Sequence, residues 1–98
     1  MKDVVVIDRD LEDLIPGFLA NRQTDISAIK AAVDVQDYES VRVIGHTLKG
    51  IGGGYGFERV TEIGAAVEQA GKRKDAVAAY ELAQELKQYL EFVEIRYE

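Results

Sequence analysis

Residues 37–56 read DYESVRVIGHTLKGIGGGYG. Apolar side chains recur in this stretch at intervals of three and four residues, which is the spacing of a helix with one buried face. These positions are Val41, Ile44, Leu48, Ile51 and Tyr55. Asp37 is suited to cap the first turn, and Gly56 is expected to end the helix. The stretch therefore predicts one helix, the second of four in the chain.

Three further segments show the same periodicity. The first runs over about 10–35, and Pro16 either kinks it or opens a second helix at its first turn. Its expected core positions are Leu11, Leu14, Ile15, Phe18, Ile26, Ile29 and Val33. The third carries apolar residues from Val60 to Ala70 and stops at Gly71, and the fourth runs from about Asp75 to Val93. Because the connections are short, we expect an all-α, antiparallel up-and-down four-helix bundle, forming one domain over residues 1–98.

The two ends of the chain fall outside this helical pattern. Residues 4–7 and 93–97 are rich in β-branched side chains, which are typical of strands. They either pair with each other beside the bundle or form frayed ends and extra helical turns.

Composition narrows the classes of function. The 98 residues include one histidine and no cysteine, which excludes disulfides, cysteine nucleophiles and metal sites built on two histidines. A formal charge of −6 argues against a nucleic-acid partner. The chain has no apolar stretch long enough to span a membrane, and its N-terminal apolar run is too short for a signal peptide. We therefore expect a cytoplasmic protein with no membrane partner.

The single histidine, His46, lies on the side of the second helix opposite its apolar stripe, because a helix turns by about 100° per residue. Its ring is therefore expected to face solvent. Arg42, Lys49, Gly50 and Gly53 share this outer face, one or two turns away. An imidazole nitrogen is a good nucleophile near neutral pH, and the arrangement suits transfer of a phosphoryl group to it. Lys49 would balance charge on the phosphoryl oxygens.

The glycines of this helix carry a cost, since each destabilises a helix interior by about 1 kcal/mol relative to alanine. Gly50 and Gly53 would leave room for a docked partner, and Gly52, with Gly53, would allow close packing of a neighbouring helix. Tyr55 and Phe57 are expected in the core. Arg42 is a further candidate for docking, with a plain surface charge as the alternative. No carboxylate cluster suited to Mg²⁺ is evident, so we expect no metal ligands and no cofactor of the chain's own.

The pattern resembles the histidine-containing phosphotransfer (HPt) family. That family is marked by His-x-x-Lys-Gly, then small residues, and a glycine about ten positions after the histidine. His46, Lys49, Gly50 and Gly56 match in that order. The likeness covers about residues 11–92, and Glu68 follows the family's pattern in the third helix. Ile51 and the glycine run at 52–54 depart from that pattern and bear on the regularity of the helix.

The resemblance implies that His46 exchanges a phosphoryl group with an aspartate of a receiver domain. Lys49 would lie beside that group, and Gly50 would leave room for the receiver. A response-regulator receiver and a sensor histidine kinase are the implied partners, with Mg²⁺ supplied by the receiver. The chain itself is expected to be a monomeric carrier with no kinase or hydrolase activity.

Two other functions stay open. The same bundle would also serve as a module that docks a receiver or kinase without being phosphorylated, or as a helical enzyme with His46 as general base. A nucleotide-binding loop is excluded, because the P-loop ends in Gly-Lys-Ser/Thr and Lys49 precedes the glycines.

Overall fold

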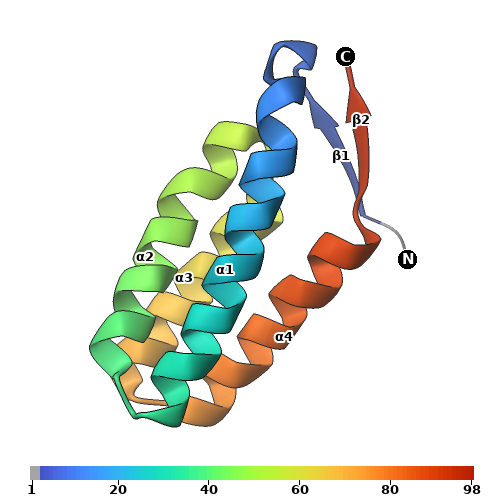
Figure 1. Cartoon of the computed structure of the whole chain (residues 1–98). Coiled ribbons are helices and arrows are strands. Elements are labelled where there is room, and N and C mark those ends of the chain that lie inside the picture. Colours follow the sequence, from blue (N-terminus) through green and yellow to red (C-terminus); the bar gives the residue numbers. More distant parts are fainter. Residues whose placement is uncertain (1–2) are drawn as a thin grey trace.

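A computed structural model describes residues 3–98. Its four helices are α1 (Ile15–Asp34), α2 (Tyr38–Gly52), α3 (Glu58–Arg73) and α4 (Ala76–Phe92). Two short 3₁₀ helices, η1 (Arg9–Leu14) and η2 (Gly53–Tyr55), precede α1 and follow α2. Successive helices run in opposite directions (Figure 1), so the predicted up-and-down four-helix bundle is confirmed. Within residues 3–98, no helix has both the length and the apolar character needed to cross a membrane.

The predicted helix starts are confirmed by their caps. The Asp37 carboxylate accepts hydrogen bonds from the backbone N–H and the hydroxyl of Ser40, which lowers the pKa of Asp37. Asp75 caps α4 in the same way by accepting from the backbone N–H of Ala78. Pro16 lies in the first turn of α1, where its missing N–H leaves no bond unmade. Of the two alternatives for Pro16, it opens a helix rather than kinking one.

Two predictions about the helices are wrong. Leu14 is 53% exposed rather than buried, because it belongs to η1, none of whose residues is buried. The third helix does not stop at Gly71 but continues to Arg73, and Lys74 takes the left-handed conformation that ends it. Gly71 instead lies against α2, where a Cβ atom would be 2.5 Å from the backbone nitrogen of Arg42.

The two ends of the chain pair with each other. Strands β1 (Val4–Ile7) and β2 (Glu94–Tyr97) form a parallel two-stranded sheet in which Val4 lies opposite Glu94. They are parallel because both run in the direction of α4. Strand β2 continues that direction after α4 ends, and β1 follows it before the chain reverses into α1 (Figure 1). Ile7 is buried and closes this end of the core. The strand-pairing alternative for the termini is therefore confirmed.

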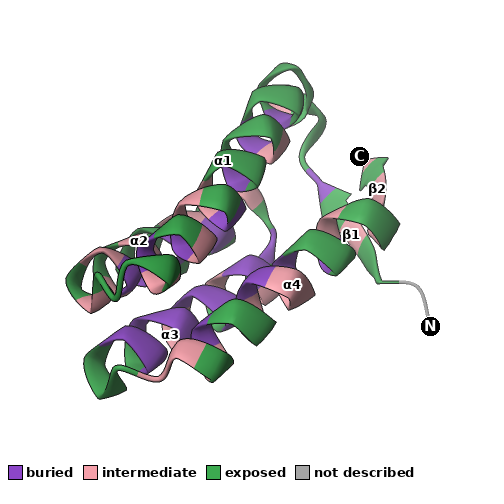
Figure 2. Cartoon of the chain, turned by 60° about the horizontal axis from the view of Figure 1, so that its bottom comes forward, coloured by how far each residue is buried: buried purple, intermediate pink, exposed green. Residues whose placement is uncertain are grey.

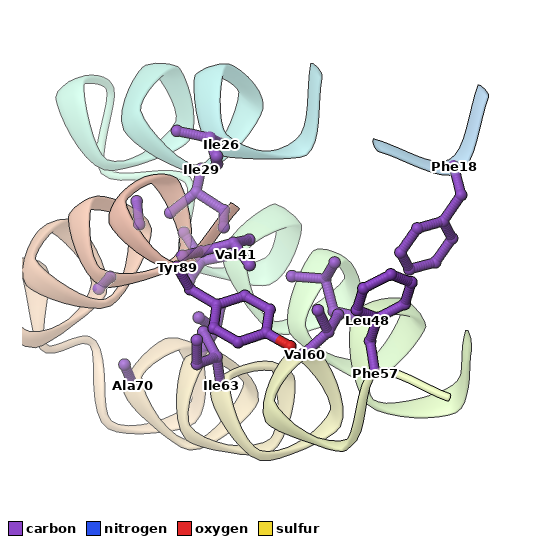
Figure 3. Close-up of a cluster of buried hydrophobic side chains, with 14 of the residues drawn as sticks. Phe18, Ile26, Ile29, Val41, Leu48, Phe57, Val60, Ile63, Ala70 and Tyr89 are labelled. Atoms are coloured by element: carbon purple, nitrogen blue, oxygen red, sulfur yellow. The ribbon is translucent and has the colours of Figure 1, made fainter. Parts of the chain in front are cut away.

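The core lies between the inner faces of the helices, where the buried residues gather (Figure 2). One end of it is aromatic: the ring of Phe18 lies 4.6 Å from that of Tyr55 and 5.0 Å from that of Phe57. The middle is filled by aliphatic side chains and by Tyr89 (Figure 3). The predicted core roles of Tyr55 and Phe57 are confirmed, with Phe57 fully buried and Tyr55 partly so.

Helices α2 and α3 pack backbone against backbone. A Cβ atom on Gly45 would lie 2.2 Å from the backbone nitrogen of Glu68, and one on Gly64 would lie 2.4 Å from that of Lys49. No side chain fits at such distances, so these glycines set how closely the two helices approach. The approach is close enough to bring side chains of α3 to the outer face of α2.

The buried face of α2 differs from the predicted apolar stripe. It runs through Val41, Gly45, Leu48 and Gly52, which rotates its centre by about 50° around the helix at 100° per residue. The rotation is toward His46. His46 therefore lies nearer to α3 than the apolar pattern predicts.

Candidate functional site

The structure places His46 in the middle of α2 with 70% of its side chain exposed, in agreement with its predicted outward position. The ring nevertheless has a protein partner. Its Nδ1 atom lies 2.9 Å from Oε2 of Glu68, which comes from α3. Nζ of Lys49, one turn after His46, lies 3.6 Å from Oε1 of the same carboxylate. The three side chains form the candidate site.

Glu68 is held in place by the close contact of the two helices. Its side chain is 8% exposed, and its backbone nitrogen is the atom that a Cβ atom on Gly45 would strike. Since Gly45 directly precedes His46, the α3 backbone passes beside the start of the histidine side chain. A buried carboxylate thus contacts an exposed imidazole ring.

The charges around Glu68 keep its carboxyl group ionised. Its pKa is lowered first by the hydrogen bond with His46, while burial opposes this and the nearby charges of Lys49 and Lys72 lower the pKa further. An ionised carboxylate only accepts hydrogen bonds. The Nδ1–H group of His46 is therefore the donor in this hydrogen bond and Glu68 is the acceptor. In a neutral ring this leaves the lone pair on Nε2.

Two of the other predicted residues also lie on the outer face. Gly50 is exposed, and a Cβ atom there would meet no atom within 4 Å. Arg42 is bound on its own helix by both carboxylate oxygens of Glu39, and this interaction lowers the pKa of Glu39. The geometry does not bring Arg42 into hydrogen-bond contact with His46.

Gly53 does not lie on α2. The α-helix ends at Gly52, Gly53 begins η2, and Gly56 takes a positive φ of 88° at its end. The prediction that Gly56 ends this helical segment is confirmed, but the last turn, Gly53–Tyr55, is 3₁₀ rather than α, because the glycines let the backbone tighten. Close packing is confirmed for Gly52, because a Cβ atom added there would lie 2.6 Å from the backbone nitrogen of Thr61. Close packing does not require a glycine at position 53, because a Cβ atom added there would lie at an ordinary distance of 3.7 Å from the hydroxyl oxygen of Thr61.

Glu68 was not among the predicted site residues. The sequence does hold a signal for it, because Glu68 follows Val67 directly within the buried face of α3. An acidic residue at such a position needs a hydrogen-bond partner. The sequence alone does not show that this partner is His46.

A family model described as Hpt domain matches residues 13–94. The chain belongs to the Hpt domain family. Searches of curated proteins and of solved structures gave no match. Hpt domains are phosphocarriers that take part in histidine phosphotransfer and interact with receiver and kinase domains of two-component systems. The match leaves β1 outside and ends where β2 begins.

In this Hpt domain, Glu68→Gln should shift the proton of the His46 ring between its two nitrogens. An amide presents either its oxygen or its NH₂ group to Nδ1, so it no longer selects one tautomer. Partners that orient a histidine are worth on the order of 10–100-fold in metal sites. We expect phosphoryl uptake to slow by about tenfold, with the bundle still folded.

The measurement is ¹⁵N NMR of the ring nitrogens together with the rate of phosphoryl uptake. Glu81→Gln, on the exposed side of α4, is the matched control and should change neither. If the Glu68 variant keeps the Nδ1–H tautomer and the full rate, Glu68 has only a structural role.

Proposed function

We propose that this Hpt domain accepts a phosphoryl group on Nε2 of His46 and passes it to or from an aspartate of a receiver domain. The observation that supports this most directly is the pairing of an exposed imidazole with a buried carboxylate. Glu68 keeps the proton on Nδ1, so Nε2 needs no base to remove a proton before it attacks.

The transfer step follows from that arrangement. Nε2 attacks the phosphorus of the receiver's aspartyl phosphate, the N–P bond forms, and the P–O bond to the aspartate breaks. The aspartate leaves as a carboxylate. Positive charge that develops on the ring is stabilised by Glu68, which already accepts the Nδ1 hydrogen bond. Reversal of the same step returns the phosphoryl group.

Lys49 is proposed to balance the charge of the phosphoryl oxygens. Its ammonium group lies beside Glu68 in the free protein, and half of its side chain is exposed. A flexible lysine at this distance reaches a group on Nε2 by rotating about its side-chain bonds. We expect Mg²⁺ to be held by the receiver.

The test is transfer from a phosphorylated receiver to the purified chain. The bound label should be lost in acid and kept in base, as expected for phosphohistidine. A receiver that binds without transfer would mean that the chain is a docking module. Label from ATP with no kinase present would contradict the carrier function.

Gly50→Gln should lower transfer by at least roughly tenfold without destabilising the fold. The position is open in the free protein, so a longer side chain strikes only a docked receiver, and glutamine also favours the helix by up to about 1 kcal/mol. Transfer rate and melting temperature are the two measurements. Gly17→Gln, equally open but at the start of α1, is the control and should leave transfer unchanged. A Gly50 variant with normal transfer would show that the receiver does not approach over this turn.

A further inference from the structure

One edge of strand β1 has backbone groups without partners. In a parallel ladder, alternate residues of a strand bond to the neighbouring strand. Ile7 accepts a hydrogen bond from the backbone nitrogen of Glu98, so the odd-numbered residues of β1 face β2. Val4 and Val6 therefore direct their N–H and C=O groups to the other side. Within residues 3–98 these groups have no hydrogen-bond partner.

This free edge borders a cleft of about 350 Å³, which we name the β1 cleft. It is lined by residues 3–6, by Gly56, Glu58, Arg59 and Glu62 at the start of α3, and by Tyr89. A smaller hollow of about 230 Å³ shares Asp3, Arg59 and Tyr89 with it and extends to Phe92. Beside β1 the molecule thus has an elongated depression rather than a flat surface.

The cleft is acidic. Among its described lining residues and those of the adjoining hollow, four carboxylates face one guanidinium: Asp3, Glu58, Glu62 and Glu85 against Arg59. Arg59 is already engaged, with Glu62 at 3.1 Å and with Glu85. The remaining negative charge favours a ligand with cationic side chains.

The cleft also offers an apolar contact and a hydrogen-bond donor. Val4 and Val6 are 48% and 54% exposed, and Phe92 is 68% exposed. The ring of Tyr89 projects from α4 toward α3 (Figure 3), and burial raises the pKa of its hydroxyl to about 12. A sheet of only two strands is marginal on its own, and a strand edge whose backbone groups lack partners is a template for a further strand.

We propose that the β1 cleft binds an extended peptide segment with basic side chains, which adds to β1 as a third strand. The peptide backbone pairs with the free groups of Val4 and Val6, and the surrounding carboxylates select lysine or arginine at alternate positions. The four residues of β1 pair with about four residues of the ligand, at about 3.3 Å per residue. Because β1 lies outside the Hpt match and apart from His46, this binding does not depend on the proposed phosphotransfer.

The test is an NMR titration of the ¹⁵N-labelled full chain with the peptide acetyl-Lys-Val-Lys-Val-Lys-Val-Lys-amide. We expect amide shifts at residues 4–7 and at Gly56, with the amides around His46 unmoved. The same peptide with glutamate for lysine, and one with proline at its centre, should bind at least tenfold more weakly. The first loses the charge match, and the second loses a strand N–H.

Variants of the chain separate the backbone and charge contributions. Val6→Pro removes an N–H of the free edge and leaves the β1–β2 ladder intact, so the peptide should bind at least tenfold more weakly, whereas Val6→Thr should bind normally. Glu58→Gln should weaken binding about two- to fivefold, the usual range for an exposed charge. His46→Gln, which tests the phosphotransfer, should bind the peptide as the unaltered chain does.

Several results would overturn the proposal. Equal binding of the lysine and glutamate peptides would show that charge does not select the ligand. Unchanged binding by both the Val6→Pro and Glu58→Gln variants would show that the peptide does not bind in the β1 cleft. If the amides of residues 4–7 shift with protein concentration in the absence of peptide, the edge pairs with a second copy of the chain, and the proposed ligand is wrong.

Discussion

His46→Gln should reduce phosphoryl uptake from full labelling to background while the bundle stays folded. His46 is the only imidazole in the chain, so no other side chain forms a phosphohistidine. The ring is mostly exposed and its replacement removes little packing. Exposed substitutions shift stability by less than about 0.5 kcal/mol. The glutamine NH₂ group also donates to the buried carboxylate of Glu68, which therefore keeps a partner.

The experiment mixes each variant with a phosphorylated receiver, follows the label by its acid lability, and checks the fold by circular dichroism. His46→Ala is the companion variant. It should lose transfer equally but melt at a lower temperature than His46→Gln, because it offers Glu68 no donor. Acid-labile label on the glutamine variant would contradict the proposed acceptor.

The helices and the exposed histidine were predictable because each depends on local signals. Asp37 and Asp75 cap their helices through side chains that lie next to the positions they bond. Periodicity alone placed His46 away from the core, since the side chains of a helix point in directions set by the residue number. The same reasoning placed Lys49 and Gly50 on the outer face.

The features that the apolar pattern does not predict depend on distances between helices. A helical wheel drawn from the apolar residues gives no weight to Gly45 and Gly52, although both belong to the buried face of α2. Their absent side chains bring α3 close and place Glu68 beside His46. At Gly71 the sequence predicts a helix end, whereas the structure uses the glycine for packing, because glycine serves both purposes. Only the neighbouring helix distinguishes a glycine that ends a helix from one that packs against it.

Gly45→Ala should destabilise the protein and disturb the site together. Alanine gains up to about 1 kcal/mol from helix propensity, but its Cβ atom would lie 2.2 Å from the backbone nitrogen of Glu68. Backbone atoms of a packed helix do not move aside as a flexible side chain does. Overpacking typically costs about 1–3 kcal/mol, occasionally more. At this distance we expect a net loss of about 2 kcal/mol, which lowers the melting temperature by roughly 10 °C.

The matched control for Gly45→Ala is Gly50→Ala on the same helix, where the new Cβ atom meets no atom within 4 Å. That variant receives the propensity gain without the clash, so its melting temperature should rise by a few degrees. In Gly45→Ala the helices must separate, which draws the Glu68 carboxylate away from Nδ1, and the ¹⁵N signals of the His46 ring should report a mixture of tautomers. Equal stability of the two alanine variants would show that α2 and α3 tolerate a wider spacing. The close contact would then not be what holds Glu68 against the histidine.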